Sequence, residues 1–110
     1  MSRSSEQAAE NESTFRAANE GIEGKTRALE FSERQRTPYL CECEDMRCTS
    51  VIRLSREEYE ALRAHPRHFA LAVGHESPQD RVVELWEGFT VVEKTGEEGR
   101  LVEENDPRRS

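Results

Sequence analysis

The first 36 residues are mostly polar, and their few apolar side chains recur at roughly helical spacing. These side chains are Ala8, Phe15, Ala18, Ile22 and Leu29. A one-sided pattern of this kind predicts a helix that docks its apolar stripe on another surface. Because a glycine in a helix interior costs about 1 kcal/mol relative to alanine, we expect the helix to break near Gly21 and Gly24.

Residues 37–94 carry nearly all of the β-branched and aromatic side chains, and they predict a small domain of short strands. Thr37-Pro38 marks its start, because the residue before a proline is pushed out of helical dihedrals. Ser55 and Glu58 fit a capping box and predict a helix that Pro66 ends. Glu87-Gly88 predicts a hairpin. The expected strands cover residues 51–54, 69–73, 81–86 and 89–94.

The segment from residue 95 onward is acidic and predicts a disordered tail. The chain therefore divides into three zones, over residues 1–36, 37–94 and 95–110. A long N-terminal helix followed by three or four short strands and one helix is an α+β fold.

Composition indicates that the core of this domain is small. Hydrophobic residues make up 34% of the 110-residue chain and charged residues 35%, against about 45–50% and about 25% in typical domains. A single small core rarely stabilises fewer than about 70–80 folded residues, so we expect a covalent or metal cross-link.

The net charge of −7 disfavours nucleic acid as a partner, because binding a line of phosphates normally requires a basic face. The sequence shows no signal-peptide pattern, and no apolar run approaches the length of a membrane span. We therefore expect a cytoplasmic protein. In a reducing cytosol, three clustered cysteines indicate metal binding or thiol chemistry rather than disulfides.

Cys41, Cys43 and Cys48 form a C-x-C-x₄-C pattern, which predicts most of a structural zinc site. The i, i+2 pair places two sulfurs on one side of an extended segment, and the four-residue insert allows Cys48 to return to the same ion. For the fourth ligand we favour His75, which follows Gly74 where a predicted strand ends. The alternatives are His65, His68, Asp45, Glu42 or no fourth protein ligand.

Two other uses of the cysteines remain open at this point. Free cysteines are often buried as small apolar groups, although Glu42, Glu44, Asp45 and Arg47 make this segment polar. The thiols could also serve redox chemistry, which requires thiolate character and exposure.

The chain resembles a group of short, uncharacterised bacterial proteins with a C-E-C-G-D-x₂-C segment. The matching stretches are Cys41-Glu42-Cys43, Cys48, Ile52-Arg53-Leu54-Ser55, Glu58-Tyr59, Gly74-His75-Glu76 and Val91-Val92-Glu93-Lys94. The resemblance covers roughly residues 11–94 and implies that Cys41, Cys43, Cys48 and His75 act as a set, but it implies no activity. Glu44 stands where the group has glycine, a departure that bears on the turn after Cys43.

The interpretation that best fits these patterns is a non-enzymatic, zinc-stabilised regulatory or adaptor module that binds another protein. Its N-terminal helix would dock on its own domain, on a second copy of the chain or on the partner. The alternative is a thiol redox sensor that releases zinc. A zinc-dependent hydrolase with Glu76 as the general base is a third hypothesis, but no catalytic constellation supports it.

Overall fold

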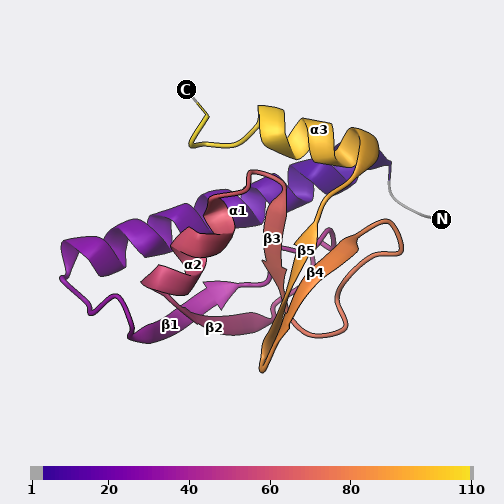
Figure 1. The fold of residues 1–110 in the computed structure, drawn as a ribbon. Coiled ribbons are helices and arrows are strands. Elements are labelled where there is room, and N and C mark those ends of the chain that lie inside the picture. The colour runs from indigo at the N-terminus through magenta and orange to yellow at the C-terminus, as the bar shows by residue number, and fades with distance from the viewer. Residues whose placement is uncertain (1–3, 110) are drawn as a thin grey trace.

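The computed structural model describes residues 4–109 and shows an α+β fold that begins with one long helix (Figure 1). Five strands and two shorter helices follow within these residues, somewhat more than the sequence predicts. In chain order the elements are α1 (Ser5–Ala28), β1 (Arg36–Leu40), β2 (Val51–Ser55), α2 (Arg56–Arg63), β3 (His68–Leu71), β4 (Arg81–Trp86), β5 (Phe89–Glu93) and α3 (Gly96–Glu104). None of these helices has the length and apolar character that crossing a bilayer requires.

The strands form two separate antiparallel sheets. Strands β1 and β2 pair as one sheet, and the residues between them, 41–50, carry the three cysteines. The second sheet has the order β3-β5-β4, and Glu87-Gly88 joins β4 to β5 in the predicted hairpin. Gly88 has a φ of +95°, a conformation that side chains with a Cβ rarely adopt.

The three-stranded sheet separates two apolar clusters. Ala70, Phe89 and Val91 face the first cluster, where β1, β2 and α2 contribute Tyr39, Ile52, Leu54, Tyr59 and Leu62. Phe69, Leu71 and Val92 face the second, which also includes Ala9, Cys41, Cys43 and Val102. Because β3 and β5 bury side chains on both faces, they read as continuous apolar runs in the sequence.

Helix α1 is continuous through Gly21 and Gly24, so the predicted break is wrong. The predicted apolar docking stripe is only partly right: Ala8 is buried and Ile22 packs against the first cluster, but Ala18 and Leu29 are exposed and Phe15 is only half-buried. The face that α1 buries is largely polar and consists of Ala8, Ala9, Asn11, Glu12, Arg16, Asn19, Glu23 and Thr26. This helix docks on its own chain by hydrogen bonds and ion pairs as well as by a small apolar contact through Ala8, Ala9 and Ile22.

The acidic C-terminal segment is not a disordered tail, because residues 96–104 form helix α3 against the first half of α1 (Figure 1). Val102 is buried in the second cluster, and the Lys94 carbonyl approaches α3 closely at Gly99. Two apolar positions, Leu101 and Val102, were too few to reveal an amphipathic helix in an acidic sequence.

The helix predicted from the capping box is confirmed as α2. The Ser55 hydroxyl accepts the backbone N–H of Glu58, and the Glu58 carboxylate accepts the backbone N–H of Ser55. Tyr59 and Leu62 lie on its buried face. The helix ends at Arg63, ahead of Pro66.

Candidate metal centre

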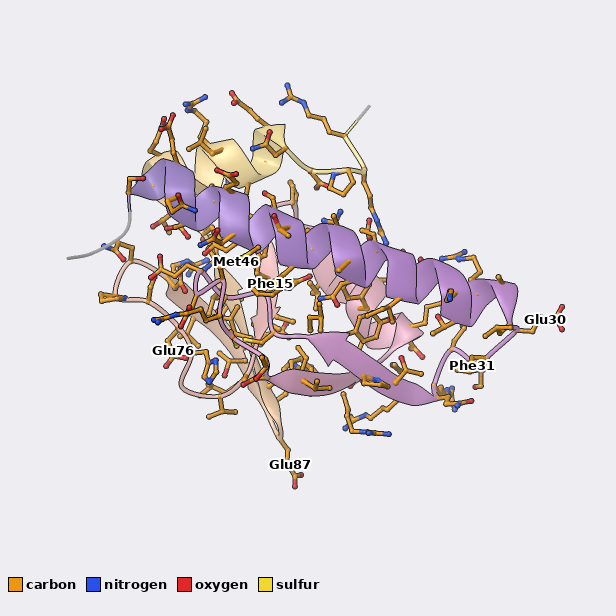
Figure 2. The ribbon with its side chains drawn as sticks, turned by 180° about the vertical axis from the view of Figure 1, so that it is seen from behind. Phe15, Glu30, Phe31, Met46, Glu76 and Glu87 are labelled. Carbon is orange, nitrogen blue, oxygen red and sulfur yellow. The ribbon has the colours of Figure 1, made fainter. Side chains whose placement is uncertain are left out.

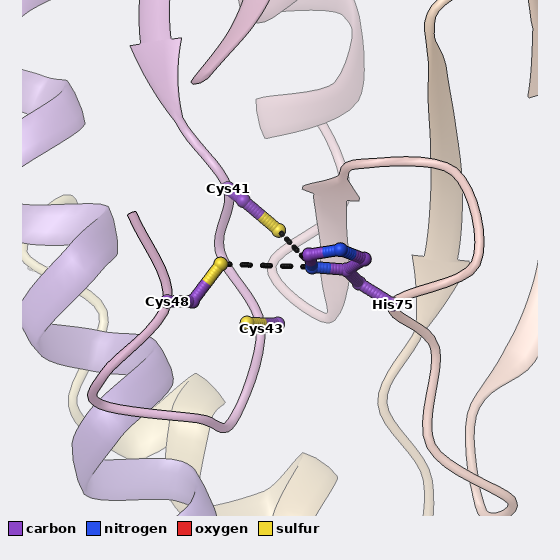
Figure 3. A group of neighbouring side chains, drawn as sticks. All are labelled: Cys41, Cys43, Cys48 and His75. Atoms are coloured by element: carbon purple, nitrogen blue, oxygen red, sulfur yellow. Dashed lines mark hydrogen bonds between the residues drawn. The ribbon is translucent and has the colours of Figure 1, made fainter. Parts of the chain in front are cut away.

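Cys41, Cys43, Cys48 and His75 come together in one cluster, in which all four ligand atoms lie within 4.8 Å of one another (Figure 3). Cys41 follows β1 directly, and Cys43 and Cys48 lie in the same β1–β2 connection. His75 comes from the turn that follows β3. The cluster therefore joins the two sheets, and the four residues predicted as ligands are confirmed as neighbours.

The spacing of the four ligand atoms fits a tetrahedral ion. A zinc ion with Zn–S bonds of about 2.3 Å and Zn–N bonds of about 2.1 Å separates sulfur from nitrogen by about 3.6 Å at the tetrahedral angle. The Nδ1 atom of His75 lies 3.6 Å from the sulfur of Cys41 and 3.6 Å from the sulfur of Cys48. These two sulfur–nitrogen separations are those that a common ion requires, and all four ligand atoms lie within 4.8 Å of one another.

The local sequence explains how the three sulfurs meet. Cys41 and Cys43 are two residues apart in extended chain, so their side chains share one side and Glu42 takes the other. A turn then reverses the chain, with the backbone N–H of Cys48 donating to the Asp45 carbonyl at 2.9 Å. Glu44 stands at the position where the resembled group has glycine, and its φ is not positive, so this turn does not require glycine.

The turn after β3 brings His75 to the thiols. Gly74 has a φ of +86°, and the backbone N–H of His75 donates to the Ala72 carbonyl at 3.1 Å. The backbone N–H of Ala72 in turn donates to the Cys41 sulfur at 3.2 Å. This hydrogen bond favours a thiolate, the form of cysteine that binds metal.

The pKa values of the Cys41 and Cys43 thiols are shifted in opposite directions. A hydrogen bond from Cys41 lowers the pKa of Cys43 to about 5, and the same bond together with burial raises the pKa of Cys41. At neutral pH the cluster therefore holds at least one thiolate. A cation placed among the sulfurs would favour the loss of the remaining protons.

Burial is uneven around the cluster. Cys41 and Cys43 are buried, Cys48 is half-buried and the His75 side chain is exposed. A groove of about 470 Å³ runs beside the last two, and Glu76 and Pro78 also line it. One side of the cluster is thus packed against the core, whereas the other is open to solutes.

Glu42 is turned away from the sulfurs and supports the loop from behind. Its carboxylate is 0% exposed and accepts hydrogen bonds from Arg16 at 3.1 Å and from Asn19 at 3.0 Å. It also accepts the backbone N–H of Ala70 in β3, at 3.1 Å. Glu42 is therefore not a ligand but a junction between helix α1, strand β3 and the cysteine loop.

Helix α1 holds the same loop at two further points. The Asn19 side-chain amide bonds both backbone groups of Leu40, donating to its carbonyl at 2.9 Å and accepting its N–H at 2.8 Å. Asn11 donates to the Glu44 carbonyl at 2.7 Å. We did not predict these supporting residues from the sequence. The available signal was the polar spacing of Asn11, Arg16 and Asn19, which share one helix face.

The other residues considered as ligands lie elsewhere or have other partners. His65 and His68 lie against each other with tilted rings, whose centroids are 4.4 Å apart, and line a cavity that contains none of the cysteines. The Asp45 carboxylate accepts the backbone N–H of Arg47 at 3.0 Å. Glu76, the general base of the hydrolase hypothesis, is exposed.

A second group of acidic side chains, Glu12, Glu44 and Glu98, also lies close together. The buried ammonium of Lys94 already supplies positive charge there, 2.7 Å from the Glu12 carboxylate and 2.9 Å from Asp80. Burial and the neighbouring Glu98 raise the pKa of Glu12 to about 10. The contact with Lys94 opposes this shift, but the effect of burial on the pKa is larger. This group ties α1 to β5 and α3 rather than holding a metal.

The chain matches no family model, no curated protein and no solved structure. The resemblance to short bacterial proteins therefore remains a prediction. Support for the metal centre comes from its geometry.

Proposed function

We propose that this protein is a zinc-stabilised module that acts by binding another protein and has no catalytic activity of its own. The observation that carries the proposal is the convergence of three sulfurs and one imidazole, from the connections that follow β1 and β3, with two sulfur–nitrogen separations of 3.6 Å. Sulfur-rich tetrahedral sets of this kind favour zinc. Four protein ligands also complete its coordination, so no position is left for a reacting water.

The proposed ion would stabilise the fold by adding a link between the two sheets to the first apolar cluster and the Glu42 hydrogen bonds that already join them. The cysteine loop bonds both α1 and β3, and the core is small for a chain of 110 residues. Binding free energy at such a site is folding free energy. A cytoplasmic location, where thiols stay reduced, agrees with this proposal.

Metal analysis of the purified full chain tests the zinc centre. We expect about one zinc per chain, and in the cobalt-substituted protein the intense charge-transfer bands of thiolate ligands in a tetrahedral field. Cys48→Ser should weaken metal binding and lower the melting temperature, whereas Thr49→Ser next to it should do neither. Metal-free protein with an unchanged melting curve would contradict the proposal.

Affinity capture tests the binding part of the proposal. The zinc-loaded full chain serves as bait, and the Cys48→Ser variant serves as the matched control. We expect a specific protein to be retained by the loaded chain and lost with the variant. The full chain is required, because removing α1 would leave Glu42 buried without Arg16 and Asn19.

Thiol redox sensing is a second candidate function, favoured by the open side of the cluster. Cys48 is half-buried and His75 is exposed, so an oxidant in the adjacent groove can reach a metal-bound sulfur. Treatment with mild peroxide distinguishes the two functions. Release of zinc together with loss of thiols would support sensing, whereas retention of the metal would exclude it.

A further inference from the structure

Strand β4 is an edge strand with most of its side chains in solvent. In the order β3-β5-β4 it has a strand neighbour on one side only, within the part of the chain that is described. Leu85 is 79% exposed, Trp86 46% and Val82 41%. An edge strand with exposed apolar side chains is a template on which another strand can pair.

A cavity of about 500 Å³ lies beside this strand, between the β4–β5 hairpin and helix α2. Leu62, Phe89 and Val91 give it an apolar lining. Trp86 stacks on Phe89, with ring centroids 5.8 Å apart, and forms an aromatic wall. The bulge between Val82 and Glu84 alters the register of β4 just before the two residues that line the cavity, Glu84 and Trp86.

The charges that line the cavity leave one carboxylate without an opposing cation. Arg34 and Arg36 are balanced by two glutamates at the start of α2, and Arg36 pairs with one of these, Glu58, at 3.0 Å. The remaining charge belongs to Glu84, whose carboxylate accepts the indole N–H of Trp86 at 2.7 Å. That bond holds a negative charge beside an aromatic ring.

One of the two histidines that line the same cavity, His68, offers an acceptor rather than positive charge. Burial and the neighbouring His65 lower the pKa of His68, which keeps the imidazole neutral at pH 7. A carboxylate, an indole face and the ring nitrogen of His68 together favour a cationic side chain. Arginine fits best, because its planar guanidinium stacks on an aromatic ring and donates several hydrogen bonds at once.

We propose that an extended segment of a partner protein pairs with the open edge of β4 and places an arginine side chain in this cavity, against Trp86 and Glu84. Backbone pairing would supply affinity, and the cavity would select the side chain. The net charge of −7 also favours a basic partner segment. This inference rests on the proposed binding function and specifies the chemistry of the partner.

Trp86 is the only tryptophan of the chain, so its fluorescence reports directly on the cavity. The zinc-loaded full chain is titrated with the capped peptide Thr-Val-Arg-Val-Thr. We expect a saturable change in Trp86 emission, and binding about tenfold weaker when citrulline replaces the arginine. Methylation of the peptide's backbone nitrogens should abolish binding, because methylated nitrogens cannot pair with β4.

Glu84→Gln is the matching change in the protein, and Glu87→Gln at the hairpin tip is its control, because Glu87 projects outward from the molecule (Figure 2) and does not line the cavity. We expect affinity for the arginine peptide to fall about tenfold in the first variant and to stay unchanged in the second. Zinc content and circular dichroism should match the unmodified protein in both variants, which shows that the fold is intact.

Three outcomes would overturn the inference: unchanged emission up to millimolar peptide, equal affinity of the citrulline peptide, or binding of arginine amide as tight as that of the peptide. Peptides selected from a random library that bind without altering Trp86 emission would also overturn this site, but they would leave protein recognition standing. Failure of the proposed function is a separate result, seen as an unchanged melting curve after zinc removal.

Discussion

Arg16 and Glu42 form a buried ion pair between helix α1 and the cysteine loop. Their nearest side-chain atoms lie 3.1 Å apart, and the two side chains are 2% and 0% exposed. The Arg16 guanidinium also stacks on the Phe69 ring, 3.5 Å from its centroid, and donates to the His68 carbonyl. One side chain of α1 thus contacts both the support of the metal loop and strand β3.

Removing one partner of this pair should destabilise the protein strongly. Arg16→Met leaves the Glu42 carboxylate buried without its counter-charge, at a cost of about 3–5 kcal/mol in the free energy of unfolding. Urea denaturation of the zinc-loaded protein measures it. Arg27→Met removes the ion pair of an exposed arginine with Glu23 in the same helix and should cost much less.

Glu42 should affect the affinity for zinc although it is not a ligand. Glu42→Gln keeps the shape of the side chain but removes the charge that Arg16 faces. Because such outer partners hold ligands in position, we expect zinc affinity to fall about 10–100-fold. Competition with a chromophoric chelator measures the affinity. An unchanged affinity would show that the loop holds its geometry without α1.

Glu12 should make stability depend on pH. Its folded pKa of about 10 lies above the ordinary value of 4.5, so the folded protein keeps a proton that the unfolded chain releases. Its contribution to stability is therefore fully present below the ordinary value and is lost as the pH rises toward 10.

Glu12→Gln mimics the protonated acid and should flatten this dependence. In denaturation series between about pH 6 and pH 9, we expect the variant to lose less stability than the unmodified protein. Glu10→Gln, an exposed position in the same helix, should leave the slope as it is. If the stability of the Glu12→Gln variant falls as steeply with pH as that of the unmodified protein, the pH dependence comes from another group.

Two glycines within helices should respond in opposite ways to alanine. Gly21 has open space where a Cβ would lie, so Gly21→Ala should raise the free energy of unfolding by about 0.5–1 kcal/mol. At Gly99 a Cβ would lie 2.5 Å from the Lys94 carbonyl oxygen, so Gly99→Ala should lower it by about 1–3 kcal/mol. Thermal denaturation of both variants checks the signs. A gain at Gly99 would mean that α3 packs less closely on Lys94.

Glu30 occupies a position suited to glycine. Its φ is +58°, and the backbone N–H of Phe31 donates to the Thr26 carbonyl at 2.9 Å, which closes helix α1 (Figure 2). Glu30→Gly should therefore stabilise the protein by about 1 kcal/mol. Gln35→Gly, in the same connection but without positive φ, should destabilise it. Chemical denaturation of the two variants gives the comparison.

The sequence predicted those features that depend on neighbouring residues. The capping box of Ser55 and Glu58 and the hairpin at Glu87-Gly88 are local, and the C-x-C-x₄-C spacing gathers three sulfurs in one loop. His75 could be chosen because a glycine marks the turn before it.

The features that the sequence did not predict depend on partners far along the chain. Apolar periodicity could not reveal that α1 buries Asn11, Arg16 and Asn19, since their partners follow more than twenty residues later. Helix α3 was missed because its buried positions have meaning only against α1.

The order of the four ligands along the chain has a consequence for folding kinetics. Three sulfurs lie within eight residues and can collect an ion in a nascent chain, but His75 reaches them only after β3 and the turn behind it have formed. A bond made that late is absent from much of the folding transition state, so it slows unfolding more than it speeds folding. Zinc would therefore act chiefly on the lifetime of the native molecule.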